Sequence, residues 1–219
     1  MDDIKRYFER KAADFDSYYR EPSHGLVAKV GHEVFRKPGL VRRFKATIDL
    51  LGHIQGLSVL DVGCGSGPYS VYLWRKGARV TGMDLASAMI ERARAAASEA
   101  GWSDPDLRIG DVMEHSPAVP YDAAIAIGVF DYLSPSIRGP FIDKLATVSR
   151  GPIIATFPKF YTPQMLVRTL YFIGKETPVY FYTPRQVRAL GERIGRAVDF
   201  VNCGPIWTVA FGLEPNGTS

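Results

Sequence analysis

Residues 59–67 read VLDVGCGSG, a short apolar run that ends in glycines at every second position. The apolar part is typical of a buried strand in a parallel sheet. Gly63, Gly65 and Gly67 allow left-handed backbone angles and let a ligand lie against main-chain N–H groups. The stretch therefore predicts a buried strand that leads into a ligand-binding turn.

The residues around this turn favour an adenosyl cofactor over a phosphate or a dinucleotide. A P-loop is excluded because no Lys-Ser or Lys-Thr pair follows the glycines. A dinucleotide fingerprint, G-x-G-x-x-G, that starts at Gly63 and Gly65 needs a third glycine at position 68. That position is Pro68, so the G-x-x-G half of the fingerprint is missing. Asp61 would repel a phosphate, and it would attract a cationic amino group or hydroxyls.

Strand and helix patterns alternate after this turn. Further strands are predicted at 79–84, 107–111, 121–129, 151–157, 197–201 and 207–213. Helices are predicted at 69–76, 86–100, 140–149 and 183–194, the last with Thr183 as N-cap and Pro184 in its first turn. We expect an α/β fold, a Rossmann-like doubly wound sheet of seven mainly parallel strands, with the last two strands antiparallel at one edge.

The chain reads as a single domain, 1–219, with two additions to the sheet. Helical patterns at 2–20, 26–36 and 40–52 predict an N-terminal helical cap over 1–52. The cofactor-binding core is expected at 53–157 and an insertion after the fifth strand at 158–182. The last helix and the edge strands then occupy 183–213.

Composition and charge narrow the class of protein further. Apolar residues make up 46% and charged residues 23% of the chain, which excludes disordered and collagen-like proteins. Cys64 and Cys203 make no disulfide framework, so we expect a reducing, cytoplasmic location. The net charge is +4 with scattered basic residues, which favours no nucleic-acid partner. Because no apolar run has the length of a membrane span, we expect no stable membrane insertion. The oligomeric state stays open.

Acidic residues also end two neighbouring predicted strands. Asp84 ends the strand at 79–84 and Asp111 the strand at 107–111. In a doubly wound sheet Asp84 is expected beside the glycine turn, where it can accept both hydroxyls of a ribose. Asp111 can accept a hydrogen bond from the exocyclic amine of a purine. The alternatives are a helix N-cap for Asp84, a solvated loop acid for Asp111 and a packed thiol for Cys64.

These segments resemble the class I S-adenosylmethionine (SAM)-dependent methyltransferases, whose product is S-adenosylhomocysteine (SAH). The residues that carry the resemblance are VLDVGCGSG (59–67), VTGMDLASAMIERAR (80–94), IGDVMEH (109–115) and YDAAIAIGVFDYL (121–133). They keep the order and spacing of that family. The resemblance implies a transferase that uses SAM and moves a methyl group to an acceptor.

The resemblance also implies which residues bind the cofactor. Backbone from Gly63 through Cys64 and Gly65 to Gly67 would hold the methionine portion, and Asp61 lies just before it. The other implied contacts are Asp84 to the ribose, Leu85 and Met89 beside the adenosyl group, Asp111 and Val112 at the adenine, Gly128, Val129 and Phe130 near the methyl group, and Tyr18 and Tyr19 on an N-terminal lid.

The residues that act on the acceptor are less sharply defined. Asp131 and Tyr132 follow the strand at 121–129 and are the first candidates for catalysis. Further candidates are His24, His32, His115, Lys159 and Tyr161. His, Cys and acidic residues show no metal-ligand spacing, so no metal is expected. Whether the reaction needs a general base stays open.

The acceptor is expected to be a small molecule, apolar or aromatic. No N-P-P-aromatic signature of base methylation follows residues 121–129, and aromatic residues are frequent in 2–20 and 157–182. The stretch TFPKFYTPQMLVRTLYFIG (156–174) is similar to the magnesium-protoporphyrin O-methyltransferase branch. Methylation of O, N or C stays open. The alternatives are a non-catalytic SAM-binding module, acting as a sensor or partner subunit, and a nicotinamide-dependent oxidoreductase.

Overall fold

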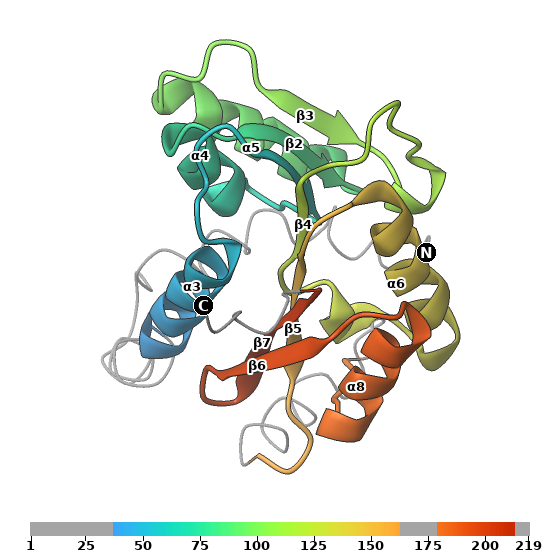
Figure 1. Ribbon diagram of the computed structural model, residues 1–219. Helices are drawn as coiled ribbons and strands as arrows, with labels where there is room; N and C mark the ends of the chain where they lie inside the picture. The colour runs from blue at the N-terminus through green and yellow to red at the C-terminus, as the bar shows by residue number, and fades with distance from the viewer. Residues whose placement is uncertain (1–36, 163–178, 213–219) are drawn as a thin grey trace, which may run out of the picture.

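The computed structural model describes residues 37–162 and 179–212, which form one seven-stranded sheet with helices on both faces (Figure 1). The strands are β1 Ser58–Val62, β2 Arg79–Asp84, β3 Asp106–Ile109, β4 Ala123–Ala126, β5 Ile153–Pro158, β6 Val198–Asn202 and β7 Ile206–Phe211. The helices are α3 Lys37–Leu51, α4 Pro68–Arg75, α5 Ser87–Glu99, α6 Pro135–Val148 and α8 Pro184–Arg193, with 3-10 turns η3 Val112–Glu114 and η4 Phe130–Tyr132.

The strand order is β3-β2-β1-β4-β5-β7-β6. Strands β1 to β5 pair in parallel, whereas β7 pairs antiparallel with both β5 and β6. The predicted doubly wound sheet with two antiparallel strands at one edge is thereby confirmed. The order reverses between β1 and β4, and ligands bind at the carboxyl ends of strands beside such a reversal.

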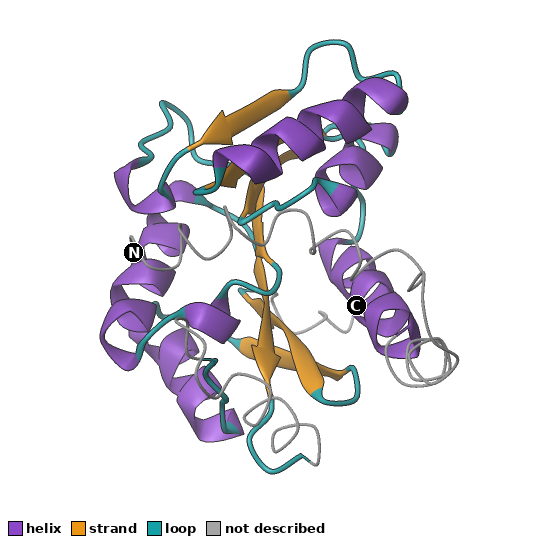
Figure 2. Cartoon of the chain, turned by 180° about the vertical axis from the view of Figure 1, so that it is seen from behind, coloured by secondary structure: helices purple, strands orange, loops and turns teal. Residues whose placement is uncertain are grey.

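Two apolar cores lie on opposite faces of the sheet. Figures 1 and 2 show α3, α4 and α5 on one side and α6 and α8 on the other. Side chains alternate along β1: Leu60 and Val62 pack in the core with α6 and α8, and Val59 packs in the core with α3, α4 and α5. Asp61 has the same parity as Val59, so its carboxylate lies on the α4 side of the sheet, where it bonds to Ser70.

Local sequence explains where α8 begins. The Thr183 hydroxyl accepts the Gln186 backbone N–H at 3.4 Å, and the Gln186 side chain accepts the Thr183 backbone N–H at 2.8 Å. This capping box satisfies two N–H groups that would otherwise have no partner at the helix start. The predicted N-cap at Thr183 and proline at Pro184 are confirmed.

Helix α6 differs from its prediction because it begins at Pro135 and includes Pro140. Pro140 removes one backbone hydrogen bond, but Phe141, Ile142 and Leu145 bury their side chains on the same helix. Strand β4 ends at Ala126 and not at Val129, because the positive φ of Gly128 turns the chain. The helices predicted at 2–20 and 26–36 lie outside the described residues.

Within 37–162 and 179–212, no helix is both long enough and apolar enough to cross a membrane.

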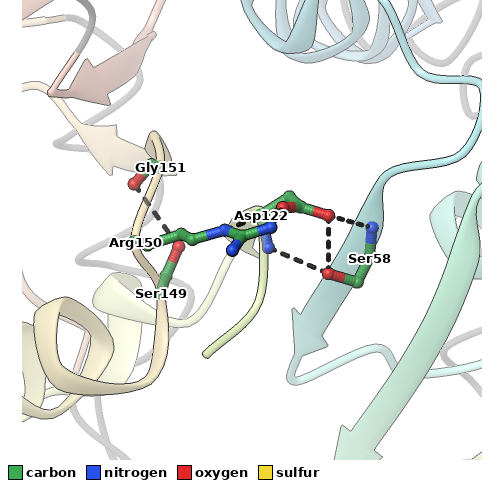
Figure 3. Close-up of polar contacts among 5 residues, drawn as sticks. All are labelled: Ser58, Asp122, Ser149, Arg150 and Gly151. Carbon is green, nitrogen blue, oxygen red and sulfur yellow. Dashed lines mark hydrogen bonds and ion pairs between the residues drawn. The ribbon is translucent and has the colours of Figure 1, made fainter. Parts of the chain in front are cut away.

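A polar network joins the amino ends of β1 and β4 (Figure 3). The Asp122 carboxylate accepts the backbone N–H and the hydroxyl of Ser58, both at 2.8 Å, and the Asp122 N–H donates to the Ser58 hydroxyl at 3.0 Å. The Arg150 guanidinium, on the segment before β5, donates to the other carboxylate oxygen. The Ser58 N–H and hydroxyl, together with Arg150, hold the pKa of Asp122 well below its usual range.

Replacing Asp122 by alanine should lower the free energy of unfolding by about 2 kcal/mol near neutral pH, because charge-assisted hydrogen bonds are lost. Urea denaturation measures this loss. Asp143→Ala, which removes an exposed ion pair with Arg193, is the control and should cost less than about 1 kcal/mol. Because folding lowers the pKa of Asp122, the gap between wild type and variant should shrink as the pH falls below about 4. A constant gap at all pH values would contradict this assignment.

Candidate functional site

The glycine loop, residues 63–67, connects β1 to α4 at the carboxyl end of the sheet. Gly63, Gly65 and Gly67 have φ values of +68°, +55° and +83°, the left-handed region that favours glycine. A Cβ on Gly63 would lie 2.6 Å from Val129 Cγ2, so Gly63 is also a point of close contact with the loop after β4. The predicted ligand-binding turn therefore has the expected backbone and lies at the reversal of strand order.

Asp84 holds this loop against the end of β2. One carboxylate oxygen accepts the Gly65 N–H and the other accepts the Ala86 N–H, each at 2.9 Å. The Met83 carbonyl also accepts the N–H groups of Gly63 and Cys64, at 2.8 and 3.0 Å. Asp84 therefore lies beside the glycine loop at the carboxyl edge of the sheet, where the sequence places the carboxylate expected to bind the ribose. The N-cap alternative is also partly realised, since Ala86 immediately precedes α5.

Asp61 lies behind the loop and not on its open side. The side chain is 2% exposed, and its carboxylate accepts the Ser70 hydroxyl of α4 at 2.6 Å. Burial raises the pKa of Asp61 to about 7, the Ser70 hydrogen bond opposes this rise, and the negative charge of Asp84 adds to it. The predicted attraction between Asp61 and a cationic cofactor group stays a prediction, and the burial of the carboxylate favours an attraction through space.

Cys64 is a packed thiol. It is buried in the core with α4 and α5, and burial raises its pKa well above the usual value, with Asp61 and Asp84 adding to the rise. A neutral, buried thiol is a poor nucleophile. This agrees with the packing alternative.

Asp111 follows β3 and starts the turn η3. Its carboxylate accepts the Met113 N–H at 2.9 Å, so it acts as the N-cap of η3. The Gly110 N–H donates to the Asp84 carbonyl at 2.9 Å, which places the ends of β2 and β3 side by side. Val112 is buried. The predicted adenine-binding pair is thus adjacent to Asp84 along the carboxyl edge.

Phe130 and Met89, two apolar residues of the predicted cofactor-binding set, are buried. The ring of Phe130 is fully buried and packs on Phe141 and Phe157. Met89 is buried with Ala86, whereas Leu85 is partly exposed beside Asp84. The Gly128 N–H donates to the Thr156 hydroxyl of β5 at 2.7 Å. In the segment after β4, Val129 is therefore the residue that lies against the glycine loop, Gly128 is bonded to β5, and the Phe130 ring lies in the core.

Asp131 and Tyr132 belong to η4, directly after this segment. Asp131 is 6% exposed and Tyr132 is partly exposed. The Asp131 carbonyl accepts the Tyr180 N–H, and the Tyr182 hydroxyl donates to the Phe130 carbonyl, both at 2.8 Å. The chain that returns from the insertion is therefore bonded to η4.

Tyr182 is a structural residue that no sequence signal singled out. Its ring is fully buried against Phe157, and the Arg138 guanidinium lies 4.6 Å from its centre. Burial raises its pKa, so the hydroxyl stays protonated as a donor. Its position between two prolines, after a run of aromatic residues, does not distinguish it from its neighbours.

The remaining candidates have other partners or lie elsewhere. His115 bonds to the Tyr121 hydroxyl at 3.0 Å, and Lys159 donates to Asn202 at 2.6 Å. Tyr161 is 83% exposed with a positive φ of 66°. Tyr18, Tyr19, His24 and His32 lie outside the described residues. In the two described ranges, no three His, Cys, Asp or Glu side chains lie close enough to hold a metal ion.

Comparison with known proteins gives a family for part of the chain. Residues 59–150 match the Methyltransferase domain family. A ubiquinone biosynthesis O-methyltransferase of Paracidovorax citrulli is 46% identical over 74 residues, 32% of this chain and 31% of that protein. The chloroplastic magnesium protoporphyrin IX methyltransferase of Arabidopsis thaliana is 30% identical over 146 residues, 64% of this chain and 46% of that protein. The chain thus spans less than half the length of these curated relatives.

A solved structure shows the same fold over nearly the whole chain. Magnesium protoporphyrin IX methyltransferase from Synechocystis PCC 6803, crystallised with bound SAH, superposes with a TM-score of 0.75 at 21% identity and covers 96% of this chain and 98% of that one. The Rossmann-like class I methyltransferase fold that the sequence predicted is confirmed.

Replacing Gly63 by alanine should destabilise the protein by about 3 kcal/mol, because left-handed strain adds to a clash with Val129. Chemical denaturation measures this change. Gly52→Ala is the matched control: Gly52 also has a φ of +68°, but a Cβ added there would meet nothing within 4 Å, and it should cost about 1 kcal/mol.

A double-mutant cycle isolates the clash. Gly63→Ala combined with Val129→Ala should be less destabilised than the sum of the two single variants by about 1 kcal/mol or more. Additive effects would show that the two loops do not press on each other at this point.

Proposed function

We propose that this chain, in which residues 59–150 belong to the methyltransferase domain family, transfers a methyl group from SAM to a small-molecule acceptor. The observation that carries the proposal is the glycine loop bonded to Asp84 where the strand order reverses. A loop without lysine, flanked by carboxylates, suits a nucleoside with hydroxyls and positive charge and disfavours a phosphate.

In this proposal, different residues at the carboxyl edge of the sheet bind different parts of the cofactor. The backbone of Gly63 to Gly67 holds the methionine portion, with Cys64 packed beneath it, and Asp84 accepts the ribose hydroxyls. Leu85 and Met89 lie beside the adenosyl group, and Asp111 and Val112 meet the adenine. Bound SAM supplies an electrophilic methyl carbon, whose reaction depends on alignment and on exclusion of water.

The acceptor binds, in this proposal, beside Gly128 to Tyr132, where the insertion returns to the sheet. Asp131 and Tyr132 are the candidate catalytic residues, because η4 directly follows the loop that contacts Gly63. A base is required only if the acceptor must lose a proton. The names of the curated relatives, ubiquinone and magnesium protoporphyrin methyltransferases, support an apolar or aromatic small molecule.

The proposal also covers organisation and location. We infer a single methyltransferase domain with a cap at 1–52, a core at 53–157, an acceptor-side insertion at 158–182 and the last helix and edge strands at 183–213. Tyr18 and Tyr19 would close over the cofactor from the cap. A cytoplasmic protein without a nucleic-acid partner fits the scattered charges and the two cysteines.

Asp84→Asn should weaken SAM binding by about tenfold or more, because hydrogen bonds to a charged acceptor contribute about 1.5–3 kcal/mol. Isothermal titration calorimetry with SAM and SAH measures the dissociation constants. Asp199 is exposed on the edge strand β6. Asp199→Asn is the control and should bind SAM and SAH as the wild type does. A thermal melt checks that the Asp84 variant is folded. If the wild type binds neither compound at millimolar concentration, the proposed function is wrong.

Turnover separates an enzyme from a binding module. A panel of quinone-like, phenolic and tetrapyrrole acceptors, assayed by SAH release, should show methyl transfer with at least one member. Tight SAM binding without consumption of SAM over the whole panel would favour the non-catalytic module.

A further inference from the structure

A buried polar pair lies directly behind the glycine loop. Asp61 on β1 and Ser70 on α4 are 2% and 0% exposed, and the hydroxyl donates to the carboxylate at 2.6 Å. Asp61 precedes Gly63 by two residues, and Ser70 follows Gly67 by three. This pair, the Asp61–Ser70 pair, therefore joins the two ends of the loop from behind.

Few groups screen the charge of this pair. Asp61 lies opposite Gly82 of β2 and Ile125 of β4 in the sheet register. A Cβ on Gly82 would lie 3.1 Å from Ser70 Oγ and 3.2 Å from Cys64 Sγ, so the serine, the thiol and the strand are in close contact. Among the described titratable groups, Asp84 at the end of β2 acts on Asp61. Asp61 in turn raises the pKa of the Cys64 thiol, which burial keeps neutral.

In the part of the chain that the structure describes, the groups that shift the pKa of Asp61 are Ser70 and Asp84, and neither is a cation. Burial, which raises the pKa of Asp61 to about 7, is opposed by the Ser70 hydrogen bond and reinforced by the charge of Asp84. A positive charge that arrives in front of the loop would stabilise the ionised carboxylate, because charges interact strongly in a weakly polar interior.

We propose that the Asp61–Ser70 pair is a charge sensor that favours the sulfonium cofactor SAM over its uncharged thioether product SAH. This inference rests on the proposed use of SAM by the chain. SAM carries one more positive charge than SAH, and the two are otherwise nearly the same size. The pair acts on the cofactor's charge through space, from behind the loop, and touches neither compound.

The proposal links cofactor preference to pH with a definite sign. SAM favours ionised Asp61, so its binding releases protons at pH values where the free protein is partly protonated, and SAH releases fewer. The affinity for SAM relative to SAH therefore rises with pH. If the pKa of Asp61 differs by one unit between the two complexes, the ratio changes about fivefold between about pH 6 and about pH 8.

The experiment is calorimetric titration of the full chain with SAM and with SAH at about pH 6, about pH 8 and about pH 9. The wild type should show the rise of about fivefold in the ratio of affinities. Asp61→Asn should show a flat ratio. Ser70→Ala removes the hydrogen bond that opposes the raised pKa of Asp61. Its ratio should therefore still rise between about pH 8 and about pH 9, where the wild-type ratio is nearly constant. Titration of the cofactor's own amino group is common to all proteins and cancels in the comparison with Asp61→Asn.

Ser149→Ala is the matched control. Ser149 is equally buried but lies after α6, at the amino end of the sheet, where its hydroxyl donates to the Gly151 carbonyl at 3.4 Å (Figure 3). It should retain the wild-type rise. If Asp61→Asn does not fold, the shift in Ser70→Ala and the proton release of the wild type, measured in buffers of different ionisation enthalpy, decide the matter.

The outcomes separate this inference from the proposed function. If SAM and SAH both bind and the ratio of their affinities changes equally with pH in the wild type and in Asp61→Asn, the charge-sensor proposal is wrong. The proposed binding of SAM would then remain supported. A Ser70→Ala ratio that stays constant between about pH 8 and about pH 9, as in the wild type, also contradicts the charge-sensor proposal. If neither compound binds, both the proposed function and the charge-sensor proposal are wrong.

Discussion

One carboxylate fixes the geometry on which the site depends. Asp84 accepts the backbone N–H groups of Gly65 and Ala86, so the loop after β1 and the start of α5 are held by the end of β2. The Met83 carbonyl adds two further bonds to the loop. A loop of three glycines loses much conformational entropy when it becomes ordered. These hydrogen bonds offset that cost. The residue expected to bind the ribose is thus also the residue that shapes the loop.

The two apolar layers meet at this site. The glycine loop leads into α4 on one face of the sheet, and the segment after β4 leads into α6 on the other. Gly63 and Val129 come into close contact where the strand order reverses. The Phe130 ring below Val129 is held by Phe141 of α6 and Phe157 of β5. The position of one loop therefore depends on packing in both cores.

The sheet and the loop could be predicted because their signals are local. The apolar run at 59–62 and the alternating glycines specify a strand and a turn without reference to other segments. The start of α6 at Pro135 could not be predicted, because burial of Phe141 and Ile142 outweighs the effect of Pro140. The inward position of Asp61 follows from its parity with Val59 along β1, but its partner Ser70 is identified only once α4 packs on the strand. Likewise, nothing near Phe130 in sequence indicates that its ring joins the core.

The insertion leaves and re-enters the sheet at neighbouring points. The Phe160 N–H donates to the Tyr182 carbonyl, and the Tyr182 N–H donates to the Pro158 carbonyl, both at 2.8 Å. These bonds close the insertion at its base, whatever the length or composition of the chain between them. Segments of other lengths can thus be exchanged between these anchor points with little loop-closure cost, so the acceptor specificity proposed for the insertion could change without any change in the glycine loop.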